Sequence, residues 1–200
     1  MVSSYASEIE KMVEERVYNK CDVVSFFKTD ETYGLLSNMK GKLLLPINGI
    51  KFTSSEAIYQ ALKFPENSEI QSKIAIEKSP MTAKRIAQSY SFKIRSDWED
   101  VKVCAMRIAL RIKALECEDF YKLLLSTNPK EIVEISRKDD FWGTYSYGEK
   151  LVGKNVLGRL LMELRNEKKD VIILHLNALL DKKNNMKVAN KIINIQIKLK

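Results

Sequence analysis

The chain has 200 residues, of which 45% are hydrophobic, and it carries a formal net charge of +8. A chain of this length forms one good core. It contains neither a run of about 18 uncharged apolar residues nor a secretion signal, so we expect a cytoplasmic protein without a membrane span. Three cysteines without CxxC spacing argue against a disulfide framework and against a structural zinc site.

The first third of the chain combines one helix with a β-rich part. Apolar residues recur at helical spacing near the start, which predicts an N-terminal helix over residues 1–20. The segments 23–27, 43–47 and 50–53 are predicted strands. The last two form a hairpin, because Asn48-Gly49 between them is the pair that best tolerates positive φ.

The rest of the chain is mainly helical. Ser54 or Ser55 caps one helix, and Ser79-Pro80 supplies the cap and first-turn proline of another. The predicted helices cover residues 55–64, 79–88, 96–112, 118–125, 129–135 and 155–169, and residues 171–200 are predicted as one or two helices broken at Asn184-Asn185. Few strands and many helices predict an α+β fold.

The positive charge is concentrated at one end. Residues 166–200 contain eight lysines and three acidic residues, so they contribute +5 of the total of +8. Such a segment either follows nucleic-acid phosphates or is simply solvated. The remainder of the chain is nearly balanced in charge.

The single histidine restricts the chemistry. His175 lies in a Leu- and Ile-rich segment, far in sequence from the polar segments described below. A Ser-His-Asp triad would depend on this one residue, and a histidine metal site would lack ligands. We therefore expect chemistry on carboxylates, lysines and hydroxyls, with no metal and no cofactor.

The first candidate site is the predicted helix after Ser54. Glu56, Tyr59, Gln60 and Lys63 fall at i, i+3, i+4 and i+7, so four polar groups share one helix face. Spacing alone leaves two interpretations open, a solvated face of an amphipathic helix or an active site.

The active-site interpretation has a chemical basis. A first-turn carboxylate such as Glu56 is held ionised by the helix dipole and suits the stabilisation of a positive transition state. Cleavage of a glycosidic bond passes through an oxocarbenium-like state of that kind. Lys63 would pair with Glu56, or its amine would attack an opened sugar aldehyde.

Three further segments suit a base or a phosphate. Arg137 to Gly143 places two aspartates beside an aromatic pair, as in a pocket that stacks a flat base or in an exposed charged loop with an anchoring ring. Gly153 to Gly158 at a helix start would cradle a phosphate, although its spacing is not that of a P-loop. Trp98 is either a core anchor or a stacking platform.

Taken in order, these segments resemble the NADAR family of YbiA-like N-glycosidases. The resemblance spans roughly Val23 to Arg165. It rests on Tyr33 to Met39, Thr53 to Phe64, Ser79 to Lys84, Asp97-Trp98, Ser136 to Gly143 and Leu151 to Arg165. It implies a single mainly helical domain around a small antiparallel sheet, and hydrolysis of an N-glycosidic bond to a phosphorylated ribose.

With this resemblance we divide the chain into three parts and assign site residues. The parts are an N-terminal helix at 1–20, an N-glycosidase domain at 21–169 and a basic helical C-terminal extension at 170–200. The catalytic residues that the resemblance implies are Glu56, Trp98, Asp139 and Lys63. The substrate-binding residues that it implies are Ser37, Asn38, Tyr59, Gln60, Lys138, Trp142 and Asn155.

Two substrates compete within the family. One branch cleaves phosphoribosylated pyrimidine intermediates of riboflavin synthesis. Another removes ADP-ribose from guanine in nucleic acid and is an antitoxin to a DNA ADP-ribosyltransferase. The Lys-Asp-Asp-Phe-Trp-Gly and Ser-Pro-Met-Thr-Ala-Lys motifs resemble the second branch more closely. We therefore expect ADP-ribosylated guanine in DNA, or a free nucleotide, as the ligand, and a toxin of that kind as a functional partner.

Two hypotheses of other classes stay open at this point. One is a module that binds ADP-ribose or nucleotides without hydrolysing them. The other is a nucleic-acid-binding scaffold driven by the basic residues at 170–200, for which binding would depend steeply on salt.

Overall fold

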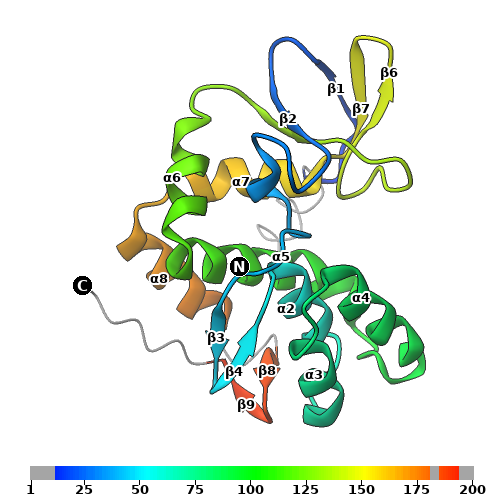
Figure 1. The fold of residues 1–200 in the computed structure, drawn as a ribbon, viewed down its shortest axis with the longest axis vertical. Helices are drawn as coiled ribbons and strands as arrows, with labels where there is room; N and C mark the ends of the chain where they lie inside the picture. The colour runs from blue at the N-terminus through cyan, green and yellow to red at the C-terminus, as the bar shows by residue number, and fades with distance from the viewer. Residues whose placement is uncertain (1–11, 181–184, 194–200) are drawn as a thin grey trace. The chain divides into compact units, whose positions relative to one another are not determined.

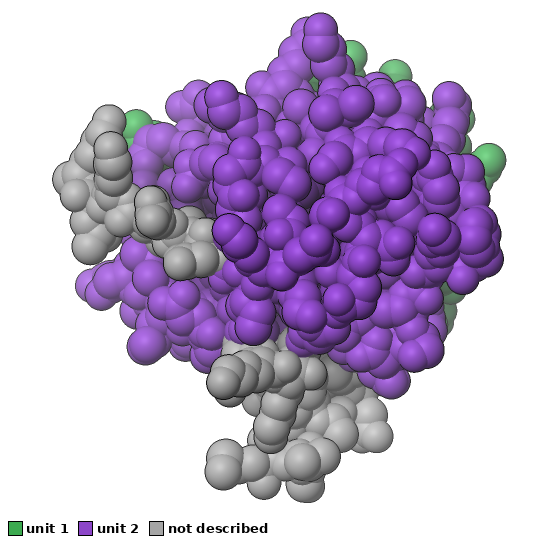
Figure 2. Space-filling view, turned by 90° about the horizontal axis from the view of Figure 1, so that it is seen from below, with its two compact units in different colours: residues 1–37, 122–166 green, residues 38–121, 167–200 purple. Residues whose placement is uncertain are grey.

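The structure is a computed structural model that describes residues 12–180 and 185–193. The chain divides into two compact units, each built from two separate stretches of sequence (Figure 2). Unit 1 comprises Met1–Ser37 and Lys122–Asn166, and unit 2 comprises Asn38–Tyr121 and Glu167–Lys200.

Unit 1 contains two small sheets and a helix. Its antiparallel sheet has the strand order β1-β7-β6, and a separate pair, β2 and β5, is parallel. The elements are β1 (Arg16–Asn19), β2 (Val24–Phe26), the short 3-10 helix η1 (Gly34–Leu36), β5 (Ile132–Glu134), β6 (Tyr145–Tyr147), β7 (Lys150–Gly153) and α7 (Val156–Arg165).

Close packing of α7 on β5 requires a glycine. A Cβ added to Gly158 would lie 2.1 Å from the carbonyl oxygen of Ile132, far inside contact distance. Asn155, fully buried before the first turn of α7, donates its amide to the same carbonyl at 2.9 Å. The absence of a side chain at position 158 and the amide of Asn155 therefore fix how helix and strand meet.

Unit 2 is mainly helical, with two hairpins. Figure 1 shows α2, α3 and α4 clustered beside α5, and each of these three helices contacts its neighbours in the cluster. The elements are β3 (Leu45–Ile47), β4 (Ile50–Phe52), α2 (Ser55–Ala61), α3 (Ser68–Ala75), α4 (Pro80–Ser89), the 3-10 helix η2 (Ser91–Lys93), α5 (Trp98–Glu116), α8 (Lys169–Leu179), β8 (Lys187–Val188) and β9 (Lys191–Ile192). The remaining helix is α6 (Glu118–Ser126).

Local signals in the sequence explain several of these boundaries. Asn48 and Gly49 have φ values of 49° and 83°, as the β3–β4 turn requires. The Ser54 hydroxyl accepts from the Ala57 N–H at 3.0 Å and caps α2. Ser79 caps α4 in the same way, with Pro80 in the first turn.

The long helix α5 runs through the core of unit 2 and buries charge along with apolar surface. Its Arg111 forms an ion pair of 2.5 Å with Glu167, and the two side chains are 4% and 8% exposed. Nδ1 of His175 on α8, the single histidine, lies 3.2 Å from the same Glu167 oxygen. Lys113 is fully buried 4.4 Å from the centre of the Phe120 ring, and burial lowers its pKa to about 7.

The α+β class is confirmed, and three predicted elements are wrong. Residues 129–135 contain strand β5 instead of a helix, because Ile132 and Val133 are fully buried and pair with β2. The expected helix at 1–20 ends in strand β1, which pairs with β7, and its first eleven residues lie outside the described part. Beyond α8, residues 187–192 form a hairpin instead of a helix.

Other elements had no clear signal. Sequence patterns did not reveal α3 or the β6–β7 hairpin. They predicted helices at 155–169 and from 171 onward, whereas α7 ends at Arg165 and α8 runs from Lys169 to Leu179. None of the described helices has the length and apolar character needed to cross a membrane.

Candidate active site

Glu56 lies in the first turn of α2 and is only 3% exposed. Tyr59 and Gln60, one turn further along, are also buried. The polar stripe predicted from spacing therefore lies inside unit 2. A solvated helix face is excluded for these three residues.

Both carboxylate oxygens of Glu56 accept hydrogen bonds from side-chain amides. Asn38 donates Nδ2–H to Oε2 at 2.5 Å, and Gln60 donates Nε2–H to Oε1 at 2.7 Å. The Glu56 N–H donates in turn to the Asn38 carbonyl at 3.0 Å. An ionised carboxylate has only acceptors, so two donors on separate oxygens fix its orientation and favour its charged form.

Gln60 has one atom whose hydrogen-bonding capacity is unused. Its Nε2 is committed to Glu56, and its buried Oε1 has no hydrogen-bond partner among residues 12–180 and 185–193. A buried acceptor without a partner is costly, by about 1–3 kcal/mol. This oxygen, attached to the same side chain that holds Glu56, is therefore suited to accept an O–H or N–H from a bound ligand.

Two aromatic rings and a lysine lie close together in unit 2. The prediction that Lys63 belongs to the Glu56 helix is wrong, because α2 ends at Ala61 and Lys63 lies in the turn that follows. The Trp98 ring, on the first residue of α5, is centred 5.0 Å from the Tyr59 ring at an angle of 60°. The ammonium of Lys63 lies 5.2 Å from the Trp98 centroid and 5.6 Å from that of Tyr59. Trp98 and Tyr59 are only 8% and 6% exposed, so both rings are packed in the core of unit 2, with a cation beside them. The role of Trp98 as a stacking platform stays a prediction.

The electrostatics of Lys63 suit a reactive amine. Burial lowers its pKa, the charge of Lys84 adds to this effect, and the carboxylate of Glu56 opposes it. A larger fraction of Lys63 is therefore neutral at a given pH than of an exposed lysine. Both roles expected from the sequence, cation and nucleophile, are compatible with this environment.

Asp139 in unit 1 has a different set of partners. Its Oδ1 accepts from the N–H groups of Phe141 and Trp142, at 3.0 and 2.9 Å. The Ser136 hydroxyl accepts from the N–H groups of Lys138 and Asp139, at 3.3 and 3.1 Å. Asp139 is thus part of the hydrogen bonding that shapes the loop in which it lies.

The predicted phosphate cradle at Gly153 to Gly158 is wrong. The N–H groups at the start of α7 that would bind a phosphate donate instead to carbonyls of the Asp139 loop. The bonds are Lys154 to Asp140, Asn155 to Gly143, Val156 to Phe141 and Leu157 to Trp142, at 2.7 to 3.1 Å. Since these donors are already used, they are not available to an anion.

The other expected binding residues of unit 1 lie in varied surroundings. Asn155 is fully buried and bonded to both ends of β5, accepting from the Glu134 N–H at 3.1 Å, so its amide serves the fold. Ser37 is buried at the end of η1, and Lys138 is exposed. Trp142 is half-buried, edge-on to Phe141 at 5.1 Å. Their binding roles stay predictions.

Sequence reasoning missed an aromatic cavity in unit 1. It has a volume of about 440 Å³ and is lined by Phe27, Ile135, Ser136, Arg137, Tyr145, Ser146 and Tyr147. The Arg137 guanidinium carbon lies 5.2 Å from the centre of the Phe27 ring. The lining comes from three separate segments with no shared motif, so no local pattern could have revealed it.

Taken together, unit 2 contains a buried carboxylate held by two amides, a pair of buried aromatic rings and a lysine of lowered pKa. These are the elements of an enzyme site that stabilises positive charge on a sugar. The chain belongs to the NADAR domain family, whose domain matches residues 25–168.

Individual relatives agree with this assignment. The Escherichia coli protein named N-glycosidase YbiA is 37% identical over 145 residues, which cover 72% of this chain and 88% of that protein. The NMR structure of YbiA superposes with a TM-score of 0.63 at 36% identity, and the match covers 78% of this chain and 88% of that one. A Vibrio vulnificus protein named as a riboflavin biosynthesis protein is 35% identical over 144 residues, covering 72% of this chain and 38% of that protein.

Proposed function

We propose that the protein is an N-glycosidase that removes ADP-ribose from ADP-ribosylated guanine in DNA, reversing the action of a DNA ADP-ribosyltransferase toxin. The observation that carries the reaction class is Glu56, a buried carboxylate whose two oxygens are fixed by Asn38 and Gln60. The 37% identical Escherichia coli relative is also named an N-glycosidase.

The reaction is a hydrolysis at the ribose C1′. As the bond from C1′ to the base nitrogen breaks, its electron pair goes to the base and positive charge develops on the sugar. The Glu56 carboxylate stabilises this charge, because a fixed anion in a buried site needs no reorganisation. Water then adds its hydroxide to C1′, and its remaining proton ends on the released base.

The neighbouring side chains of unit 2 orient the substrate. The Trp98 and Tyr59 rings stack against the flat base. The unpartnered Oε1 of Gln60 accepts from a ribose hydroxyl. Lys63 binds the pyrophosphate, pairs with Glu56, or forms a transient Schiff base with the opened sugar, and its lowered pKa supports the last role.

The choice of a nucleic-acid substrate rests on two observations. The Lys-Asp-Asp-Phe-Trp-Gly and Ser-Pro-Met-Thr-Ala-Lys motifs resemble the guanine-specific branch. The cavity of unit 1 combines exposed aromatic rings with a guanidinium, which is the chemistry that binds unpaired bases and their phosphates. A net charge of +8 is compatible with a polyanion.

A second candidate is hydrolysis of a phosphoribosylated intermediate of riboflavin synthesis. It is favoured by the name of the Vibrio vulnificus relative, which is 35% identical. Both substrates contain a nitrogen heterocycle attached to a phosphorylated ribose, so both are compatible with Glu56, Trp98 and Lys63.

Parallel hydrolysis assays discriminate between these candidates. The protein is incubated with an oligonucleotide containing ADP-ribosyl-guanine and, separately, with the riboflavin intermediate, and released sugar phosphate is measured by chromatography. We expect kcat/KM to be higher for the oligonucleotide. Faster cleavage of the riboflavin intermediate would reverse the assignment. Saturable binding of ADP-ribose without cleavage of either substrate would show a binding module instead.

A further inference from the structure

The segment 185–193 packs tightly on unit 2, although it lies beyond the family match at 25–168. Met186, Val188 and Ile193 are at most 4% exposed. The side chains that receive this segment come from both the β3–β4 turn and α3. A lysine-rich end that merely followed nucleic-acid phosphates would not bury its apolar side chains in this way.

Two amide side chains of unit 2 bind the backbone of the hairpin. Gln71 on α3, itself fully buried, donates to the Lys187 carbonyl at 2.7 Å and accepts from the Ala189 N–H at 3.0 Å. Asn48 donates to the Val188 carbonyl at 2.9 Å. The β8–β9 hairpin is therefore held through its main chain, as a strand is held in a sheet.

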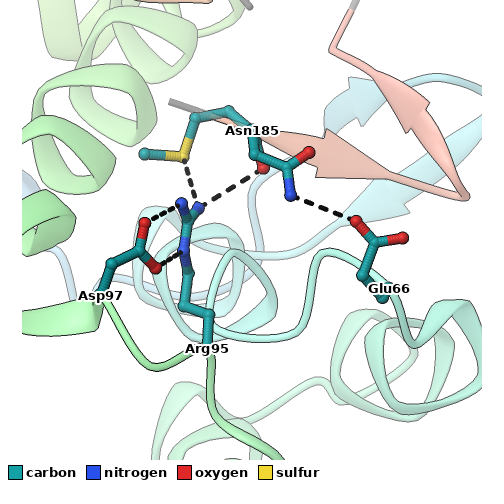
Figure 3. Close-up of polar contacts among 5 residues, drawn as sticks. Glu66, Arg95, Asp97 and Asn185 are labelled. Atoms are coloured by element: carbon teal, nitrogen blue, oxygen red, sulfur yellow. Dashed lines mark hydrogen bonds and ion pairs between the residues drawn. The ribbon is translucent and has the colours of Figure 1, made fainter. Parts of the chain in front are cut away.

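The same segment contacts Arg95, whose side chain is only 7% exposed. Arg95 binds Asp97 through both prongs of its guanidinium, at 2.6 and 2.7 Å. Its Nη1 also donates to the Asn185 carbonyl at 3.4 Å and lies 3.9 Å from Sδ of Met186 (Figure 3). The guanidinium thus joins the start of α5 to the hairpin segment.

The main chain of Arg95 reaches two of the candidate catalytic residues. Its N–H donates to the Lys63 carbonyl at 3.0 Å, and its carbonyl accepts from the Trp98 N–H at 3.2 Å. The ammonium of Lys63 and the ring of Trp98 are 5.2 Å apart. Any shift of Arg95 is therefore transmitted through two backbone hydrogen bonds to both groups.

We propose that Arg95 and the docked segment 185–193 are positioning elements of the active site. Through Asn185 and Met186, which contact the guanidinium of Arg95, the docked segment fixes the start of α5 and with it the distance between Trp98 and Lys63. This inference rests on the proposed function of these two residues. It assigns the segment to unit 2 as a structural part of the site, in place of a free tail that binds nucleic acid.

The test uses full-length variants that undock the hairpin. Val188→Asp places a charge at a fully buried position. Arg95→Lys keeps the positive charge but loses the two-pronged contact. Lys168→Gln is the matched control, because it removes one exposed lysine outside the docked segment.

Activity and fluorescence are measured on each variant. We expect Val188→Asp and Arg95→Lys to lower kcat by about 10-fold or more, since small misplacements of reacting groups have effects of this size, while KM changes less. In a Trp142→Phe background, acrylamide quenching of Trp98 should increase in both variants. Lys168→Gln should match the wild type in both readouts.

Two outcomes overturn the inference. One is a folded Val188→Asp protein with wild-type kcat and wild-type quenching of Trp98. The other, which applies if Val188→Asp does not fold, is an Arg95→Lys protein with wild-type kcat and wild-type quenching of Trp98. A protein that cleaves neither substrate would refute the proposed function. Quenching of Trp98 does not depend on turnover, so it would still test the positioning role.

Discussion

Glu56 in unit 2 and Asp139 in unit 1 each accept two hydrogen bonds, but from different kinds of donor. Glu56 is held by the side chains of Asn38 and Gln60, one on each oxygen. Asp139 accepts two main-chain N–H groups on Oδ1 alone. The first arrangement orients a carboxylate without building the local backbone, whereas the second shapes a loop. Substitution of Glu56 should therefore lower activity more than stability, whereas substitution of Asp139 should lower the stability of its loop.

The largest effect is expected at Glu56. Glu56→Gln keeps the size of the side chain and removes the charge that stabilises the ribosyl cation, so kcat should fall by about 10³-fold, or about 4 kcal/mol. The free energy of unfolding in urea should change by less than about 1 kcal/mol, because Asn38 keeps an oxygen acceptor and the Gln60 amide can turn so that its Oε1 accepts from the new NH2 group. Glu69→Gln, which changes an exposed first-turn glutamate of α3, is the control. Wild-type turnover by Glu56→Gln would refute the mechanism.

Substitution of Lys63 tests whether its amine reacts covalently with the sugar or only supplies a positive charge. Lys63→Arg retains the cation but not a nucleophilic amine, and a Schiff-base role predicts a loss of about 10²-fold in kcat. Borohydride should trap an adduct with the wild type. Because burial lowers the pKa of Lys63, the yield of trapped adduct should rise with pH, and this rise should occur at lower pH than the titration of an exposed lysine. Near-wild-type kcat in Lys63→Arg, with no trapped adduct, would leave an electrostatic role.

Substitution of Lys113 tests how much a buried charge lowers the free energy of unfolding. Burial lowers its folded-state pKa to about 7, from the ordinary lysine value of 10.5 that applies in the unfolded chain. Between these values the unfolded chain binds more protons, so this lysine makes wild-type stability increase with pH, by about 2 kcal/mol from pH 7 to pH 9. Lys113→Met should be more stable at pH 7 and should lack this increase, as measured by urea unfolding at both pH values. Exposed Lys168→Met serves as the control, and an unchanged pH profile in Lys113→Met would contradict the assignment.

Asp139 gives the smallest free-energy change among these four predictions and the sharpest contrast with Glu56, because its effect falls on stability. Asp139→Ala should lower the free energy of unfolding by about 1–2 kcal/mol, since two loop N–H groups lose their acceptor. Asp139→Asn retains an oxygen for those donors and should be close to the wild type in stability. A marked loss of kcat in folded Asp139→Asn would support the catalytic role implied by the family. Equal stability of both variants would show that the two bonds to Oδ1 contribute little.

Short-range signals in the sequence were reliable guides to structure. The Asn48-Gly49 turn, the Ser54 and Ser79 caps and the start of α5 at Trp98 are all present. Each depends on backbone geometry and hydrogen bonds within a few residues, so the sequence specifies it directly.

Elements stabilised by distant partners were not predictable in this way. The segment containing Ile132 and Val133 has an apolar pattern compatible with helix, and only pairing with β2 makes it a strand. The same holds for residues 187–192, whose hairpin is fixed by Asn48 and Gln71. Strand pairing depends on contacts far away in sequence, which local periodicity does not report.

The sequence by itself determined that Glu56, Tyr59 and Gln60 share one face of a helix, because the helical period follows from their spacing. It was wrong about Lys63, which follows the end of α2 at Ala61. Only the tertiary structure decided that this face is buried, that Asn38 and Gln60 hold the carboxylate, and that Trp98 lies beside Lys63. Burial and side-chain pairing depend on which elements pack together. They changed an ambiguous polar stripe into a defined site.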